Sequence, residues 1–576
     1  MKRIVATLLF LTFAAPALAQ DIRTLAEQGD ANSQVILGIE YEKGGAGVPQ
    51  DYVEAMKWYR MAADQGNVGA QGLLGFMYYL GKGVPQDYAQ AGKWYRLAAE
   101  QGDATAQFVL GDMYATGGHG VAQNYAEAMK WRRLAAEQGY ADAQRFLGFM
   151  YSNGEGVPQD YAEAIKWYRK AADQGNADAQ HSLGLMYDKG QGVRRDQAEA
   201  AKWYRKATAQ NNATAQIDLA EKYSHGEGVT QDYAEAVKWY RKAAEQGNAK
   251  AQASLGAIYH AGYHGVPQDY AAAVKWYRLA AEQGYANAYF SLGYMYYAGQ
   301  GVTRDYAEAA KWYRKAADQG DGTAQFMLGD MYADGQGVPQ DYAGALKWFR
   351  KAAEQGYVMA QVSLGNMYYG GQGVAQNYAE AMKWYREAAD LGSALAESDL
   401  GGMYFSGQGV PQDSAEAMKW YRKAADKGDA TAQSLLGFMY EGVQGVPQDY
   451  AEVVKWFRKA ADQGNIGAQV NLGYIYAKGQ GVLQDYTEAM KSFRKAAEQG
   501  NESAQYELGA AYYNGQGVPQ DYMQAYMWLN LSAAQGVVHA TELRDRVAKQ
   551  MAPAQIAEAQ KLAREWTAAF AKRKEN

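Results

Sequence analysis

Aromatic and apolar positions recur along this chain with a fixed period. Tryptophans come every 36 residues, or every 37 in two places, and Ser492 occupies the one register that lacks a tryptophan. They stand at Trp58, Trp94, Trp131, Trp167, Trp203, Trp239, Trp276, Trp312, Trp348, Trp384, Trp420, Trp456 and Trp528. A period of this size is typical of stacked supersecondary units that contact only their neighbours. The pattern therefore predicts an elongated repeat array without a single closed core.

The first half of each period predicts a short helix. Asn176 suits an N-cap, and Ala179, Leu183 and Tyr187 follow it at a spacing of four residues. Gly184 lies inside this helix, where glycine costs about 1 kcal/mol relative to alanine. We expect another backbone segment to approach closely at that point. A glycine-rich loop ends the helix.

The second half predicts an amphipathic helix with clearer signals. Asp160 suits its N-cap and Glu163 stands at the third helical position, which is a capping-box arrangement. Its buried face is formed by Ala164, Trp167, Tyr168 and Ala171. Gly175 ends the helix in the left-handed conformation, and Asn211 takes that place in the one copy without glycine. We expect the tryptophan to be buried between one helix pair and the next.

These elements predict an all-α fold in which antiparallel helix pairs stack along residues 20–536. Helical patterns continue through residues 537–576, where Pro553 suits a first helical turn. An array of this kind needs a terminal unit to cover its last apolar face. We interpret residues 537–576 as that cap, with Trp566 and Phe570 packing against the final repeat.

Composition and charge narrow the function. Apolar residues make up 48% of the 576 residues, and there is no cysteine, which excludes disulfides and thiolate chemistry. Residues 1–19 resemble a signal peptide, with Lys2 and Arg3, a short apolar run and Ala17-Leu18-Ala19 as the cleavage signal. Cleavage takes the net charge from −6 to about −8, which disfavours nucleic-acid binding. We expect a periplasmic or secreted protein with no transmembrane segment.

The recurring pattern A-Q-x-x-L-G-x-M-Y, followed by G-V-x-x-D-Y and W-Y-R-K-A-A, resembles the Sel-one-like repeat family, a relative of the tetratricopeptide repeat. Its first half is carried by Ala179-Gln180, Leu183-Gly184, Met186-Tyr187 and Gly192-Val193. Its second half is carried by Asp160-Tyr161, Ala164 and Trp167-Tyr168-Arg169-Lys170-Ala171-Ala172. The resemblance covers about residues 25 to 536. It implies an α/α superhelical solenoid of about 14 repeats, a scaffold or adaptor role, and no shared catalytic residues or cofactor. Some exported relatives are cysteine-rich and linked to penicillin or cell-wall binding, and this chain departs from them in having no cysteine.

Positions that vary between repeats indicate where a partner binds. In the first helix they form a second stripe, which we expect on the concave face of the solenoid. The candidate partner-binding residues are Phe290, Tyr294, Tyr297, Asp330, Asn366, Tyr369, Phe405 and Phe438. Aromatic side chains are favoured anchors at protein interfaces. The alternative interpretation is that these residues fill space between neighbouring helices.

Metal binding, phosphate binding and catalysis have weaker support in the sequence. His260 and His264 lie close in sequence but lack a third ligand at metal spacing, so we expect no metal site. The Gly190-Gln191-Gly192-Val193 loop lacks the preceding strand of a phosphate-binding loop, and no catalytic nucleophile motif stands out. The sequence thus favours a protein-interaction scaffold without enzymatic activity. A cell-wall glycan binder and a β-lactam hydrolase are the alternatives.

Overall fold

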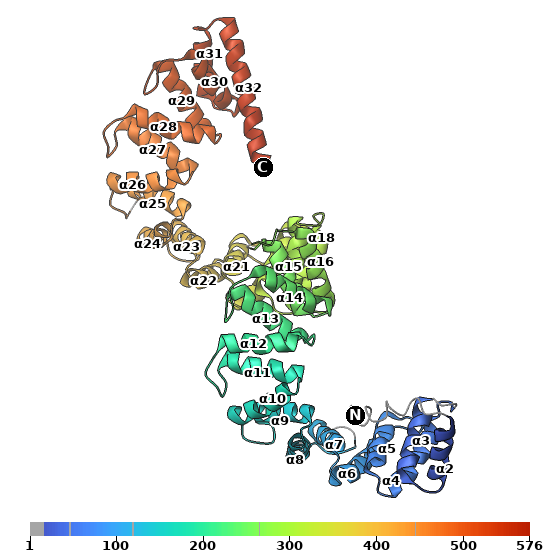
Figure 1. Ribbon diagram of the computed structural model, residues 1–576. Helices are drawn as coiled ribbons and strands as arrows, with labels where there is room; N and C mark the ends of the chain where they lie inside the picture. Colours follow the sequence, from blue (N-terminus) through green and yellow to red (C-terminus); the bar gives the residue numbers. More distant parts are fainter. Residues whose placement is uncertain (1–15, 45–47, 118–119, 264, 444, 576) are drawn as a thin grey trace. The chain divides into compact units, whose positions relative to one another are not determined.

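A computed structural model describes residues 16–44, 48–117, 120–263, 265–443 and 445–575. Every regular element in these residues is a helix, and consecutive helices form pairs along the chain (Figure 1). The all-α solenoid that the sequence predicts is confirmed. The residues of the predicted export signal lie largely outside the described part, which begins at residue 16.

Each repeat consists of a first helix and a second helix. The first helices are α3(Ala31–Lys43), α5(Val68–Leu80), α7(Ala104–Thr116), α9(Ala141–Asn153), α11(Ala177–Lys189), α13(Ala213–His225), α15(Ala249–Ala261), α17(Ala286–Ala298), α19(Gly322–Asp334), α21(Val358–Gly370), α23(Ala394–Ser406), α25(Ala430–Gly442), α27(Ile466–Lys478) and α29(Glu502–Asn514). The second helices are α4(Tyr52–Asp64), α6(Tyr88–Glu100), α8(Tyr125–Glu137), α10(Tyr161–Asp173), α12(Gln197–Thr208), α14(Tyr233–Glu245), α16(Tyr270–Glu282), α18(Tyr306–Asp318), α20(Tyr342–Glu354), α22(Tyr378–Asp390), α24(Ser414–Asp426), α26(Tyr450–Asp462), α28(Tyr486–Glu498) and α30(Tyr522–Ala534). α2(Pro16–Glu27) precedes the first pair, and α31(Val538–Ala548) and α32(Pro553–Glu575) follow the last.

The chain divides into two compact units. The first comprises Met1–Ala288 and Gln300–Val302, and the second comprises Tyr289–Gly299 and Thr303–Asn576. Within each unit, hydrophobic clusters follow one another along the stack, each built from two to four adjacent helices. The array predicted to lack a single closed core therefore has several small cores, as expected of a solenoid.

A glycine in the first helix receives an aromatic ring from the second helix of the same repeat. A Cβ atom built on Gly184 would lie 2.6 Å from the ring of Tyr204, and one on Gly329 would lie 2.6 Å from the ring of Phe349. The same contact joins Gly38 to Tyr59, Gly75 to Tyr95, Gly148 to Tyr168, Gly256 to Tyr277, Gly293 to Tyr313, Gly365 to Tyr385, Gly401 to Tyr421, Gly437 to Phe457 and Gly473 to Phe493. We expected a backbone segment at Gly184, and this was wrong: the close neighbour is a side-chain ring.

The helix ends are as the sequence predicts, except that the capping box does not form. Asp160 accepts a hydrogen bond from the Glu163 N–H, as an N-cap does. The Glu163 carboxylate does not complete a capping box, because the Asp160 N–H already donates to the Tyr151 carbonyl. The carboxylate instead pairs with Lys166 at 2.8 Å. Asn211 has a φ of 61°, as its place at the end of α12 requires.

Buried glutamines connect the repeats in a regular ladder. Gln107 of α7 donates its amide N–H to the Ala99 carbonyl of α6 at 3.0 Å, and its carbonyl accepts from Gln138 after α8 at 2.8 Å. Equivalent glutamine pairs, with distances of 2.7–3.0 Å, join residues 65 and 34, 101 and 71, 174 and 144, 210 and 180, 246 and 216, 283 and 252, 355 and 325, 463 and 433, 499 and 469, and 535 and 505. Apart from the rung at Gln216, whose buried amide nitrogen has no hydrogen-bond partner among the described residues, these rungs satisfy buried polar groups while they hold three consecutive helices together.

The tryptophans differ in their burial. Those at 131, 167, 203, 348, 384, 456 and 528 are buried, whereas Trp312 is partly exposed. Trp312 stacks on Tyr289 with ring centres 5.9 Å apart and donates its indole N–H to Glu308. At the C-terminal end, Trp528 of α30 meets Trp566 of α32 edge to face, with ring centres 6.0 Å apart. Trp566 in turn stacks on Phe570.

Adjacent glycines in α23 test the ring contact directly. A Cβ on Gly401 would lie 2.6 Å from the Tyr421 ring, whereas one on Gly402 would lie 3.6 Å from the Tyr421 hydroxyl. We expect Gly401→Ala to destabilise the second unit by about 1–3 kcal/mol through overpacking. Gly402→Ala is the control and should stabilise it by about 0.5–1 kcal/mol through helix propensity. Thermal unfolding and amide exchange in α23 measure both, and equal effects of the two variants would contradict the ring contact.

Candidate functional site

The candidate stripe lies on five successive first helices of the second unit, from α17 to α25. Three of its aromatic residues are exposed: Tyr294 at 38%, Tyr369 at 37% and Phe438 at 48%. Phe290 and Phe405 are partly buried. The structure thus separates the predicted residues into side chains that project and side chains that pack inside the stack.

The packed members contact the second helix of their own repeat. The Phe290 ring lies 5.5 Å from the Tyr313 ring, and Tyr297 meets Tyr306 edge to face at 5.2 Å. Phe405 packs against the cluster that contains Tyr421. Such contacts are the ones expected under the alternative interpretation, in which these residues fill space between helices.

Polar groups of the stripe are fixed by neighbouring side chains. Tyr369 donates its hydroxyl to Gln408 at 2.6 Å and meets Tyr378 edge to face. The Asn366 carbonyl accepts from the Tyr385 hydroxyl at 2.6 Å. These bonds hold the side chains in defined rotamers, so an incoming partner would order few of them on binding.

Two carboxylates in or beside the stripe are desolvated. Burial, together with the nearby Asp334 carboxylate, raises the pKa of Asp330. Burial, with Asp429 as the second cause, raises the pKa of Asp399 to about 6. Among the described residues neither carboxylate forms an ion pair within 4.0 Å. Carboxylates in this state favour a protonated form or a positively charged neighbour.

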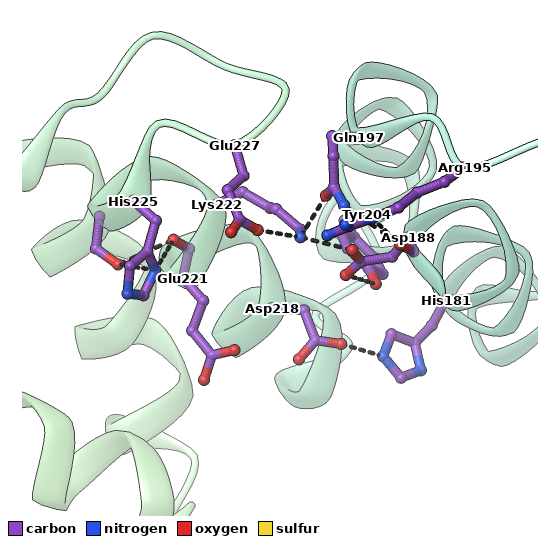
Figure 2. Close-up of polar contacts among 11 residues, drawn as sticks. His181, Asp188, Arg195, Gln197, Tyr204, Asp218, Glu221, Lys222, His225 and Glu227 are labelled. Atoms are coloured by element: carbon purple, nitrogen blue, oxygen red, sulfur yellow. Dashed lines mark hydrogen bonds and ion pairs between the residues drawn. The ribbon is translucent and has the colours of Figure 1, made fainter. Parts of the chain in front are cut away.

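A second polar cluster, which sequence reasoning missed, lies in the first unit (Figure 2). Lys222 of α13 is buried where neighbouring repeats have Met186 and Ile258, and its ammonium donates to Asp188 and Glu227, each at 2.8 Å. It also donates to Gln197, which stands where other second helices begin with tyrosine. The signal available in the sequence was this pair of departures, Gln197 and Lys222, in two adjacent repeats.

The charges of this cluster compensate one another. Burial raises the pKa of Asp188, but the hydrogen bond and positive charge of Lys222 outweigh it and hold that pKa below its usual value. Hydrogen bonding to Lys222 likewise lowers the pKa of Glu227. On the same stack, His181 lies 2.7 Å from Asp218 of the next repeat. All of these groups have partners inside the cluster, which is consistent with a structural role.

Neither a metal site nor a membrane-spanning helix is found among the residues that the structure describes. The part of the chain that the structure describes contains no group of three or more histidines and acids able to hold a metal ion. His260 bonds to Gln300, whereas His264 lies outside the described residues. None of the helices in the described ranges combines the length and apolar character needed to cross a membrane.

The paired helices, capped by Asp or Asn and joined by glutamine rungs, define a helical-repeat solenoid. The Sel1 repeat matches the chain 14 times in succession, at residues 31–67, 68–103, 104–140, 141–176, 177–212, 213–248, 249–285, 286–321, 322–357, 358–393, 394–429, 430–465, 466–501 and 502–537. The chain belongs to the Sel1 repeat family, as its sequence pattern predicts. Sel1 repeat proteins generally act as protein–protein interaction scaffolds.

Solved structures include similar proteins. A protective antigen present in uropathogenic Escherichia coli strains, which displays an SLR fold, is 38% identical, with 84% of this chain and 97% of that chain covered and a TM-score of 0.56. A Sel1 repeat protein from Oxalobacter formigenes is 35% identical, with 54% and 89% covered and a TM-score of 0.44. A comparison with curated proteins finds no match.

The raised pKa of Asp399 predicts a pH-dependent stability. Because the folded state holds this proton more tightly than the unfolded state, the contribution of Asp399 is most favourable below pH 4 and is lost as pH rises towards 6. Asp399→Asn should therefore stabilise the protein by about 1–2 kcal/mol at pH 7 and leave stability at pH 3.5 nearly unchanged. Thermal unfolding at both pH values measures this. Asp390→Asn at an exposed site is the control, and an equal gain at both pH values would contradict the assignment.

Lys222 is expected to be stabilising only together with its partners. Lys222→Met restores the residue type of the neighbouring repeat but leaves the Asp188 carboxylate without its cation, which should cost about 2–4 kcal/mol. Adding Asp188→Ala should recover most of that loss. Chemical denaturation of the two single variants and the double variant completes the cycle. Additive effects of the two substitutions would show that the pair is not coupled.

Proposed function

We propose that this chain is an exported scaffold that binds a protein partner along the first helices of its second unit, on the concave face of the solenoid. The observation that carries this proposal is the row of exposed aromatic side chains on every second repeat, Tyr294, Tyr369 and Phe438. Isolated exposed aromatics are ordinary, but a row with polar groups between them is typical of an interface.

The charges of the stripe specify the partner further. Asp330 and Asp399 lie beside the aromatic row, and burial raises the pKa of both carboxyl groups. A partner that brings Lys or Arg side chains would supply the positive charge that these carboxylates lack, and shielding from water would strengthen the attraction. We therefore propose a partner with a basic and partly apolar surface.

Export follows from the N-terminal segment. The charged start, the short apolar run and Ala17-Leu18-Ala19 support a cleavable signal, so we propose that the mature chain acts in the periplasm or outside the cell. The partner would then be an envelope or extracellular protein.

Substitution of the exposed row tests this function. We expect Tyr294→Ser, Tyr369→Ser and Phe438→Ser, combined in one chain, to reduce partner capture at least tenfold, because hot-spot aromatics contribute most of the binding energy. Tyr297 is left intact, because its contact with Tyr306 makes it part of the packing. The measurement is crosslinking in the native envelope followed by mass spectrometry.

The control carries Tyr125→Ser and Tyr263→Ser, which remove exposed tyrosines of the first unit. It should retain the crosslinked proteins of the native chain. Equal crosslinking by both variants would place the interface elsewhere. Loss of peptidoglycan-fragment binding, with no protein crosslink in the native chain, would instead identify a glycan binder.

A further inference from the structure

A cavity of about 570 Å³ opens between α20 and α22, on the side of the second helices, with α21 at its base. Its walls include Glu354 of α20 and Glu380, Trp384 and Glu387 of α22, and Gln361 of α21 reaches its interior. The stripe of the proposed function runs along the first helices, so the cavity is a separate site.

The cavity contains a buried acceptor that lacks a donor. Gln361 is 97% buried and donates its amide to the Ala353 carbonyl, but its side-chain oxygen has no hydrogen-bond partner. In the other rungs of the ladder this oxygen accepts from a glutamine that follows the second helix, as Gln325 does from Gln355 at 2.9 Å. Here that position is Leu391, whose side chain cannot donate. A ligand of this cavity would therefore have to supply the missing N–H donor to the Gln361 oxygen.

Trp384, the tryptophan of this repeat, also lacks a lysine that lies over the indole ring in several other repeats. In seven other second helices, the third residue after the tryptophan is a lysine whose ammonium lies 3.8–4.6 Å from the indole ring centre, at residues 170, 206, 242, 315, 351, 423 and 459. At Trp384 this position is Glu387, which reverses the charge. The remaining tryptophans have methionine or leucine at this position, so Trp384 is the one tryptophan with a carboxylate there, where seven others receive an ammonium.

The remaining charges leave the cavity acidic. Elsewhere the glutamate at the register of Glu380 pairs with a lysine three residues later, as Glu308 does with Lys311 at 2.7 Å. Within the described residues Glu380, Glu354 and Glu387 form no ion pair within 4.0 Å. Lys383 lies 5.3 Å from the Trp384 ring centre, and Arg350, which also lines the cavity, donates to the Tyr368 hydroxyl. Three carboxylates thus face two cations around an indole ring and an unpaired acceptor.

We propose that this cavity binds an alkylammonium group, of the kind that a lysine side chain of a partner protein presents. The ammonium lies over Trp384 beside Glu387, in the place of the lysine that other repeats carry, and an N–H of the ligand donates to the Gln361 oxygen. The site is independent of the aromatic stripe, since no residue of the stripe lines it.

The test uses the full chain and short probes of known chemistry. Calorimetry and saturation-transfer NMR measure binding of the peptide Ac-Gly-Lys-Gly-NH2, of the same peptide with norleucine in place of lysine, and of 1,4-diaminobutane. We expect saturable binding of the lysine peptide and at least tenfold weaker binding of the norleucine peptide. Binding of the diamine without the lysine peptide would overturn the assignment to a protein side chain, and no saturable binding of either would overturn the site.

A variant that restores the residues of the other repeats gives the sharpest comparison. Glu387→Lys with Leu391→Gln supplies both missing groups from within the chain, so the unfolding temperature should stay equal or rise. Affinity for the lysine peptide should fall at least tenfold. Glu245→Lys, at an exposed position of α14, makes the same charge change far along the chain and should leave affinity unchanged. Undiminished binding by the restored variant would overturn the proposal.

Discussion

The packing of an aromatic ring against a glycine is the contact on which the rest of this structure depends. Because Gly329 has no side chain, the Phe349 ring reaches the backbone of α19 and sets the distance between the two helices of that repeat. The glutamine rungs require that spacing, since their amides bridge helices over 2.7–3.0 Å. Ala220 replaces the glycine in one repeat, and that repeat also holds the buried Lys222. In this repeat the departure from the ring contact and the departure from the apolar core occur together.

The sequence predicts local features of this fold well. The Asp160 cap and the left-handed Asn211 depend on groups within a few residues of one another, so their chemistry is visible in the chain. The neighbour of Gly184 and the partner of the Glu163 carboxylate were not predictable in this way. The first depends on how the Tyr204 ring packs against Gly184. The second depends on the Tyr151 carbonyl, which accepts the Asp160 N–H that a capping box would need.

In the candidate sites, too, local features were predictable from the sequence and features that depend on packing were not. Repeat-to-repeat variation identified the aromatic positions of the stripe, but it could not separate the exposed Phe438 from the packed Tyr297, because exposure depends on the facing helix. The cavity beside Gln361 was even harder to predict from the sequence, because it forms where the donor side chain of the ladder is absent. Once the glutamine ladder is known, Leu391 is recognisable in the sequence as a residue that interrupts it, and Glu387 as the residue that replaces a lysine near Trp384.

The ladder also bears on how a protein of this length can change over generations. The glutamine pair of a rung lies within one repeat, and its bond to the preceding repeat is made to an alanine carbonyl, so a duplication or deletion of a whole number of periods rejoins a glutamine to an equivalent carbonyl. A change by part of a period would leave a buried amide without its mate. Recombination between the segments that encode the repeats is therefore tolerated mainly in whole-repeat steps, and such steps can lengthen the stack without altering the contacts at any junction.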